Sequence, residues 1–169
     1  GDYIIGEIDY VAISNWKVNI RYPLNAILPV NGIEEFVRKD EDLTKYYKRG
    51  DIIFARIDSV TKSMISQLSM KDRKTRKLFG GRIIEMTPLK IPRLIGKEGT
   101  MISQIKNKTG CIINVGQNGR VWLKGNNMDI AINTIKMVEK LSHKHGLTNI
   151  ISDYLDNELK NNKLKKEKP

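Results

Sequence analysis

Two glycines separated by two residues, Gly96 and Gly99, are the feature of this sequence with the clearest binding chemistry. Glycine lets a backbone approach a sugar–phosphate chain closely, and the free amides at the start of a helix favour an anion. The residues that follow Gly99 have apolar side chains at helical spacing, so the pair lies where a helix begins. Four cations surround this GxxG: Arg93, Lys97, Lys106 and Lys108. Gly96, Gly99 and these cations are therefore candidates for contact with a nucleic-acid backbone.

A second candidate set lies near the N-terminus, in an alternating segment from Trp16 to Arg21. Period-two alternation predicts a strand with Trp16, Val18 and Ile20 on its buried face. Its other face carries Lys17, Asn19 and Arg21, which are candidates for binding RNA, and we expect Lys17 and Arg21 to contact phosphates. Arg120 is a further candidate because it flanks Trp122 on another predicted strand. The sequence leaves open whether Trp122 stacks a base or packs against a neighbouring domain.

No arrangement of residues predicts catalysis, a metal or a cofactor. A nuclease needs clustered carboxylates or a positioned base, and the run Asp40–Asp42 lies in a polar connection without partners at regular spacing. Cys111, His143 and His145 are too few for a four-ligand zinc site. We expect Cys111 to be a buried structural thiol. The aromatic pair Tyr46 and Tyr47 lies among cations and fits RNA contact or loop packing equally well.

Composition agrees with a polyanionic partner and excludes several classes. The 169 residues contain 30 Lys and Arg against 19 Asp and Glu, a formal charge of +11. Counted by segment, residues 1–77 contribute +3, residues 78–146 contribute +7 and residues 147–169 contribute +1. One cysteine cannot form a disulfide framework, no run of about 18 apolar residues suits a membrane span, and no secretory signal is visible. These features predict a soluble, cytoplasmic protein.

The elements that must position the candidates near the N-terminus are strands. Segments rich in β-branched and aromatic residues alternate with turn residues over the first seventy residues. The predicted strands are residues 3–13, 16–21, 25–30, 52–57 and 64–69. Five short strands, with the longest connection between the third and the fourth, fit an OB-fold barrel at 1–70.

After residue 81 the sequence predicts both strands and helices. A strand at 82–86 is followed by Pro88 and Pro92, which predict an extended stretch. A helix at 100–108 ends at Gly110, and two strands, 111–115 and 120–124, are joined by a hairpin at Gln117–Gly119. Asn126 or Asn127 then caps a long amphipathic helix.

The segment between the two predicted domains and the C-terminal segment show the least regular spacing of apolar residues. Residues 71–77 hold five cations in seven residues, ahead of Gly80 and Gly81, and we expect a basic linker at 71–80. Such a block is either a solvated linker or a phosphate-contacting segment. After the domain at 81–146, residues 147–169 predict a short helix and then, from Lys160, a disordered basic tail.

Both halves of the sequence resemble known RNA-binding modules. The stretch Ile91–Ile102 followed by Thr109–Val115 is similar to a KH domain of type I, with the order β-α-α-β-β-α. The first seventy residues resemble an S1-type OB domain at Gly6–Ile8, Trp16–Ile20, Ala26–Pro29, Gly50–Asp51 and Gln67–Ser69. The stretch Val115–Gly125 is very similar to exosome cap subunits. Residues 1 to about 146 thus resemble the KH-containing RNA-binding cap subunits of the archaeal exosome, and the predicted fold class is α+β.

The resemblance implies a non-catalytic role. Such subunits form a three-fold cap on a hexameric ring of phosphorolytic exoribonuclease subunits, capture single-stranded RNA for 3′-to-5′ degradation, and are associated with A-rich tails. Two other readings remain: a transcription or translation factor with S1 and KH domains, and an assembly scaffold with vestigial RNA sites. Family members also carry a small β-rich domain ahead of the S1 domain, whereas this chain starts at the first barrel strand. Lys17, Ile27 and Pro29 stand where many S1 domains have aromatic residues, and Glu98 inside the GxxG opposes a phosphate.

Overall fold

The computed structural model describes residues 1–21 and 23–167, which form two compact units. The first unit consists of Gly1–Gly80 together with Val115–Arg120, and the second consists of Gly81–Asn114 together with the chain from Val121 on. Among the described residues, no helix combines the length and the apolar content needed to cross a bilayer.

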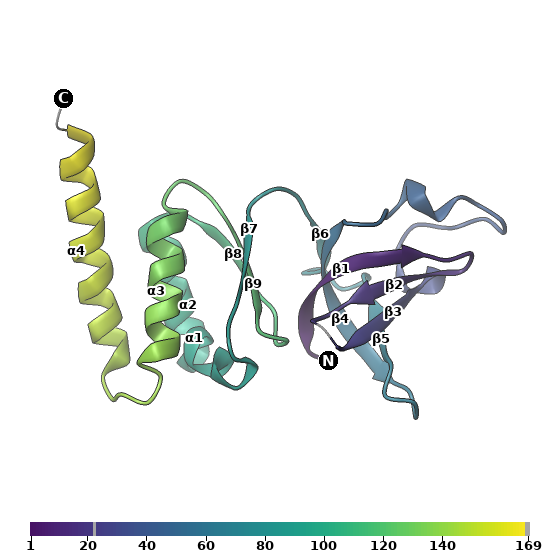
Figure 1. Cartoon of the computed structure of the whole chain (residues 1–169), viewed down its shortest axis with the longest axis horizontal. Coiled ribbons are helices and arrows are strands. Elements are labelled where there is room, and N and C mark those ends of the chain that lie inside the picture. The colour runs from purple at the N-terminus through teal and green to yellow at the C-terminus, as the bar shows by residue number, and fades with distance from the viewer. Residues whose placement is uncertain (22, 168–169) are drawn as a thin grey trace. The chain divides into compact units, whose positions relative to one another are not determined.

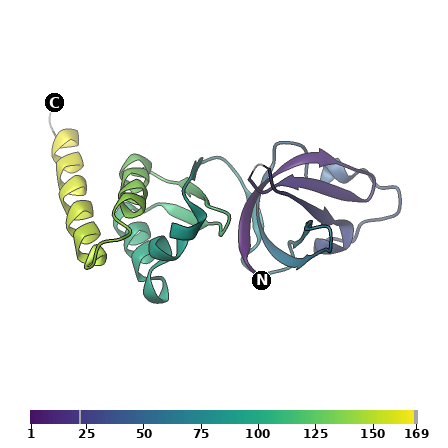
Figure 2. The same ribbon diagram turned by 60° about the horizontal axis from the view of Figure 1, so that its bottom comes forward.

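The first unit is a closed β-barrel (Figures 1 and 2). Neighbouring strands follow the order β1-β2-β3-β5-β4, and β1 also pairs with β4, which closes the sheet on itself. All pairings are antiparallel except β3 with β5. The strands are β1 (Tyr3–Val11), β2 (Asn15–Asn19), β3 (Asn25–Pro29), β4 (Ile52–Val60), β5 (Ser66–Ser69) and β6 (Arg76–Leu78). Short 3-10 turns follow β3 at Val30–Gly32 and precede β4 at Leu43–Lys45. The five-stranded OB-fold predicted from the sequence is confirmed.

The alternation of β2 places its apolar residues in the barrel core. Trp16 and Val18 are fully buried and Ile20 is nearly so, whereas Lys17 is exposed. The Trp16 indole donates a hydrogen bond of 2.9 Å to the carbonyl of Tyr47, so its one polar atom is satisfied inside the core.

The segment at 71–80 is not a linker, contrary to the sequence-based expectation. Residues 76–78 form β6, which pairs antiparallel with the first residues of β4. Leu78 is buried, so this strand has an apolar anchor as well as its ladder. The exposed β4 backbone offers hydrogen bonds to any extended segment, and a three-residue strand in a run of cations carries too little apolar pattern to be predicted.

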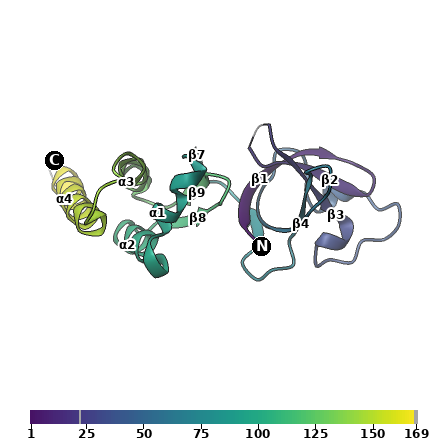
Figure 3. The same cartoon turned by 90° about the horizontal axis from the view of Figure 1, so that it is seen from below.

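The second unit is a three-stranded sheet covered on one face by helices (Figure 3). Its elements are β7 (Arg82–Glu85), α1 (Ile91–Ile95), α2 (Thr100–Thr109), β8 (Ile112–Val115), β9 (Arg120–Lys124) and α3 (Met128–Lys140). The last residue of β8, Val115, and the first of β9, Arg120, belong with the hairpin between them to the first unit. The sheet order is β7-β9-β8, so the last strand lies between the other two. The side chains of Ile91, Leu94, Ile105, Leu123 and Ile135 are fully buried between the layers. This is the β-α-α-β-β-α order predicted for a type I KH domain.

Pro88 and Pro92 do not keep their segment extended. Pro88–Lys90 forms a 3-10 turn and Pro92 lies in the first turn of α1. A proline is tolerated at the start of a helix, because the amide that it lacks would have no partner inside the helix.

The C-terminal segment is one long helix, α4 (Leu147–Glu167), and the prediction of a disordered tail from Lys160 is wrong over the described residues. Leu147, Ile151 and Leu155 recur every four residues and are buried. They anchor the first turns on α2 and α3 (Figure 3). Once nucleated by this packing, a helix extends at little cost through Lys, Asn and Leu. Lys168 and Pro169 lie outside the described residues.

Candidate nucleic-acid interface

Four side chains form a row on the outer face of the barrel, one from each of four adjacent strands. The strand register places Tyr10 of β1 opposite Lys17 of β2, Lys17 opposite Ile27 of β3, and Ile27 opposite Gln67 of β5. Tyr10, Lys17 and Gln67 are exposed and Ile27 is half-buried. An aromatic ring, a cation, an apolar side chain and an amide therefore lie side by side, and we call these four residues the strand row.

Tyr10 reaches the strand row through a β-bulge. Along β1, Ile8 pairs with Val18 whereas Tyr10 pairs with Lys17, so two steps on β1 match one on β2. Strict alternation from the buried Ile8 would place Tyr10 in the core, but the extra residue turns it outward, where 58% of its surface is exposed. The Lys17 ammonium lies 5.6 Å from the centroid of its ring, within range of a cation–π contact. Tyr10 is a functional candidate that the sequence reasoning missed, because the bulge leaves no signal in the pattern.

Asn19, Arg21 and Arg120 lie close together and are bonded to one another. The Asn19 side-chain oxygen accepts a hydrogen bond of 2.9 Å from the Arg21 amide and one of 3.2 Å from the Arg120 guanidinium. Arg120 also donates to the Asn19 carbonyl at 3.0 Å, and Arg21 donates to the carbonyl of Asn118. Arg21 has a φ of 109°, which is strained for a residue other than glycine. These bonds hold the end of β2, and the RNA contacts predicted for the three residues remain predictions.

The GxxG forms a tight loop between α1 and α2. Gly96, Glu98 and Gly99 all have positive φ, at 78°, 56° and 74°. A Cβ on Gly96 would lie 2.7 Å from the Cβ of Met101, so only glycine fits there, whereas Gly99 faces open space. The loop therefore keeps its backbone accessible beside Gly99. Lys97 and Glu98 are both exposed on it.

The four cations around the GxxG have different roles in the structure. Lys97 and Lys106 are exposed and have no side-chain partner among the described residues. Arg93 donates hydrogen bonds of 2.8 and 2.7 Å to the carbonyls of Ser142 and Lys144, beyond the end of α3. Lys108 forms an ion pair of 2.9 Å with Asp156 of α4. Arg93 and Lys108 thus hold helices together, and Lys97 and Lys106 are the cations left to attract a phosphate.

The remaining aromatic candidates are packed in the two cores. Tyr47 lies edge-to-face on Trp16 with ring centroids 5.3 Å apart, and Tyr46 meets the same indole at 6.5 Å. Burial raises the pKa of the Tyr47 hydroxyl to about 12. Trp122 is buried on β9 beside Gly81. Loop packing is therefore the observed role of the Tyr46–Tyr47 pair, and Trp122 does not present its ring to a base.

Cys111 and Asn127 lie near the ends of secondary-structure elements in the second unit. Cys111 is buried and forms no disulfide within the described residues, as expected for a structural thiol. Asn127 occupies the N-cap position of α3, but its side chain donates to the Thr109 carbonyl instead of bonding the first turn of the helix. In the described part of the chain, no three His, Cys, Asp or Glu side chains gather closely enough to hold a metal ion.

Comparison with known proteins gives three findings. A family model described as a KH domain matches residues 81–129. The chain is 43% identical to the exosome complex component Rrp4 of Methanobrevibacter smithii, over 92% of this chain and 52% of that protein. It is 42% identical to Rrp4 of Picrophilus torridus, over 92% of this chain and 68% of that protein. The chain thus spans about half to two thirds of the length of these curated relatives.

A solved structure is similar over nearly the whole chain. It is the crystal structure of a candidate exosome complex RNA-binding protein, with a TM-score of 0.82 and 32% sequence identity. The match covers 95% of this chain and 94% of the other.

Proposed function

Since the chain belongs to the family of the exosome complex component Rrp4, we propose that it is a non-catalytic, RNA-binding part of an exosome cap. In this role it captures single-stranded RNA in the cytoplasm and guides the 3′ end to a phosphorolytic exoribonuclease ring. The ring is hexameric and the cap trimeric in this proposal. In this proposal the α+β chain carries two RNA-binding modules, an S1-type barrel and a KH domain.

The observation that carries the proposal is the strand row. The face formed by the second and third strands of an OB-fold is its usual surface for oligonucleotides, and the row crosses that face. Tyr10 supplies a ring on which a base can stack, and Lys17 supplies charge for the phosphate next to it. Stacking and charge together give binding that tolerates many sequences, as a protein that feeds a nuclease requires.

The GxxG loop supports a second contact with the same RNA. KH domains clamp about four nucleotides at this loop through backbone and phosphate contacts. Here Lys97 attracts the phosphates and Glu98 repels them, so the loop contributes a smaller share of the affinity than the strand row.

The test combines native mass spectrometry with a degradation assay. The chain is mixed with 5′-labelled single-stranded RNA, first alone and then with the purified hexameric ring of its source organism. We expect RNA that is bound but intact with the chain alone, and faster 3′-to-5′ shortening in a complex of one ring with three copies. Shortening of the RNA by the chain alone would contradict the non-catalytic role. A ring that never gains mass would contradict the assignment to the cap.

A further inference from the structure

The run of cations after β5 forms an ordered turn on the barrel. We call Lys71–Arg76 the basic turn; it connects β5 to β6. Its four cations, Lys71, Arg73, Lys74 and Arg76, are exposed, and Asp72 is its only acid. The function proposed above uses none of these residues.

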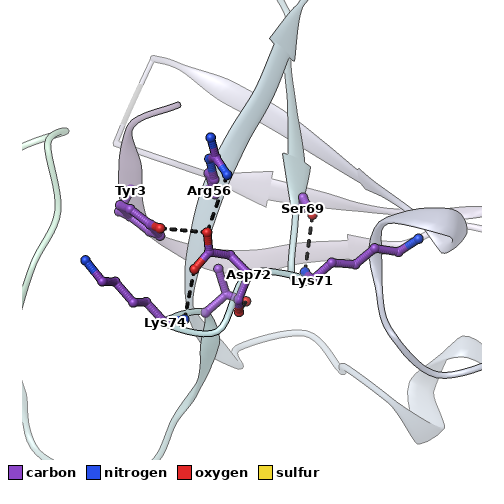
Figure 4. A network of polar contacts seen from close by, with 7 residues as sticks. Tyr3, Arg56, Ser69, Lys71, Asp72 and Lys74 are labelled. Carbon is purple, nitrogen blue, oxygen red and sulfur yellow. Dashed lines mark hydrogen bonds and ion pairs between the residues drawn. The ribbon is translucent and has the colours of Figure 1, made fainter.

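Asp72 holds the basic turn in one conformation (Figure 4). Its carboxylate accepts hydrogen bonds of 2.9 Å from the Lys74 amide and 2.7 Å from the Tyr3 hydroxyl, and it lies 3.4 Å from the Arg56 guanidinium. The Asp72 carbonyl accepts a further bond of 2.6 Å from the Thr75 hydroxyl. The amide of Lys74 and then the other donors lower the pKa of the Asp72 carboxyl. The one negative charge in the turn is thus directed inward, toward the barrel.

The cations of the basic turn are exposed around that anchor. Figure 4 shows the Lys71 and Lys74 side chains projecting to opposite sides of the turn. Within the described part of the chain, Lys71, Arg73 and Lys74 form no ion pair. A turn that is fixed by its own acid and carries three exposed cations without an ion pair is preorganised for an anion, since little ordering entropy is lost on binding.

The basic turn also continues the strand row. Gln67, the last member of that row, lines a hollow of about 230 Å³ together with Pro29, Asn31, Lys71 and one acid, Asp58. A strand of nucleic acid that crosses the row from Tyr10 to Gln67 would therefore reach Lys71 next.

The aromatic ring nearest the turn is unsuited to stacking a base. Tyr3 packs on Phe54 with ring centroids 5.4 Å apart, and the Lys74 ammonium lies 5.5 Å from the centroid of the Tyr3 ring. The chemistry exposed here is charge alone, which recognises phosphodiesters without regard to base.

We propose that the basic turn is a second RNA site on the barrel, which binds the phosphates of the strand that leaves the strand row at Gln67. This inference rests on the proposed function, because it assigns a further surface to the same RNA. It predicts that the turn adds affinity and salt dependence equally for all base sequences.

The first experiment measures fluorescence anisotropy of labelled 15-nucleotide A-rich and mixed RNAs with the whole chain at several salt concentrations. The double variant Arg73→Gln with Lys74→Gln removes two phosphate contacts. We expect the salt slope to fall by about 1.4 and the affinity at 0.1 M salt to fall roughly ten- to thirtyfold for both RNAs. The control variant Lys39→Gln with Lys45→Gln removes the same charge from the β3–β4 connection and leaves affinity within about twofold of wild type.

The second experiment separates the effect of an ordered basic turn on RNA binding from the effect of net charge. Asp72→Ala removes a negative charge and releases the turn, whereas Asp153→Ala removes an exposed negative charge on α4 that makes no hydrogen bond or ion pair among the described residues. We expect Asp72→Ala to weaken RNA binding severalfold and Asp153→Ala to leave it unchanged or tighter. Circular dichroism verifies that Asp72→Ala is folded. If it is not, Tyr3→Phe replaces it, because this change removes one hydrogen bond to Asp72 and keeps the ring.

The outcomes distinguish this inference from the proposed function. Wild-type affinity and slope in the Arg73/Lys74 variant, with weaker binding in a Lys17→Ala variant, would overturn the second site alone. Tighter binding by both aspartate variants would show that net charge acts without preorganisation and would also overturn it. No binding of RNA by the wild-type chain would overturn both.

Discussion

Tyr10 and Lys17 face each other across β1 and β2, with the Lys17 ammonium 5.6 Å from the centroid of the Tyr10 ring. The cation holds the ring in place, and the bulge in β1 keeps both side chains on the outer face of the barrel. This pair combines the stacking surface and the charge that single-stranded RNA requires.

Replacing Tyr10 tests the stacking half of this pair. Tyr10→Ala should weaken binding of single-stranded RNA by about 1–3 kcal/mol, the usual contribution of stacking for one base. Tyr10→Phe is the matched control, since it keeps the ring, and should bind within about twofold of wild type. Equal losses in the two variants, measured by anisotropy titration, would show that the hydroxyl and not the ring makes the contact.

Lys106 and Lys108, two residues apart on α2, should separate binding from stability. Lys108→Gln breaks the ion pair with Asp156 and the 2.8 Å bond to the Ser152 hydroxyl, so it should lower the free energy of unfolding by about 1 kcal/mol and leave RNA affinity unchanged. Lys106→Gln should lower RNA affinity and leave the free energy of unfolding unchanged, because Lys106 is exposed. Urea denaturation and anisotropy measure the two quantities. Reduced RNA affinity in Lys108→Gln would mean that Lys108 contacts RNA and is not held by its ion pair with α4.

Glu98 gives a gain-of-function test of the GxxG loop. Glu98→Gln removes the charge that opposes a phosphate and should tighten RNA binding severalfold, with the largest effect at low salt. Asp153→Asn, an exposed change on α4, is the control and should have no effect. If the two variants bind alike, the KH loop is not part of the RNA path.

The barrel should lose stability in alkali because of Tyr47. Burial raises the pKa of this phenol to about 12 in the folded state, while in the unfolded chain it stays near 10. The contribution to stability is therefore complete below pH 10 and is lost as pH rises toward 12, by up to about 1.4 kcal/mol per pH unit. Urea denaturation between pH 8 and pH 11.5 measures the effect. Tyr47→Phe should flatten this part of the curve, and an unchanged slope in that variant would assign the loss to another group.

The sequence predicts the elements whose side chains follow a regular period. Trp16, Val18 and Ile20 alternate with polar residues, so the face of β2 that meets the core could be predicted. Gly96 and Gly110 mark the ends of helices through their backbone requirements, and both have positive φ in the structure. Local pattern is sufficient for these features.

Features that depend on distant partners could not be predicted in this way. Arg93 and Lys108 look like binding cations in the sequence, but their partners lie 44 to 51 residues further along the chain. Tyr10 points outward only because of a bulge, and Arg76–Leu78 form a strand only because the start of β4 offers them a backbone to pair with. Such contacts depend on the tertiary structure and leave no periodic trace.

The salt dependence of RNA binding tests the central claim most directly. The affinity of the whole chain for a labelled 15-nucleotide single-stranded RNA is measured from 50 to 400 mM salt, for wild type and for Lys17→Ala with Lys97→Ala. The account predicts a linear fall of log affinity with log salt for wild type, and a slope smaller by about 1.4 in the double variant, one phosphate for each lysine. An affinity that is independent of salt, or a double variant with the wild-type slope and affinity, would contradict RNA capture through these two surfaces.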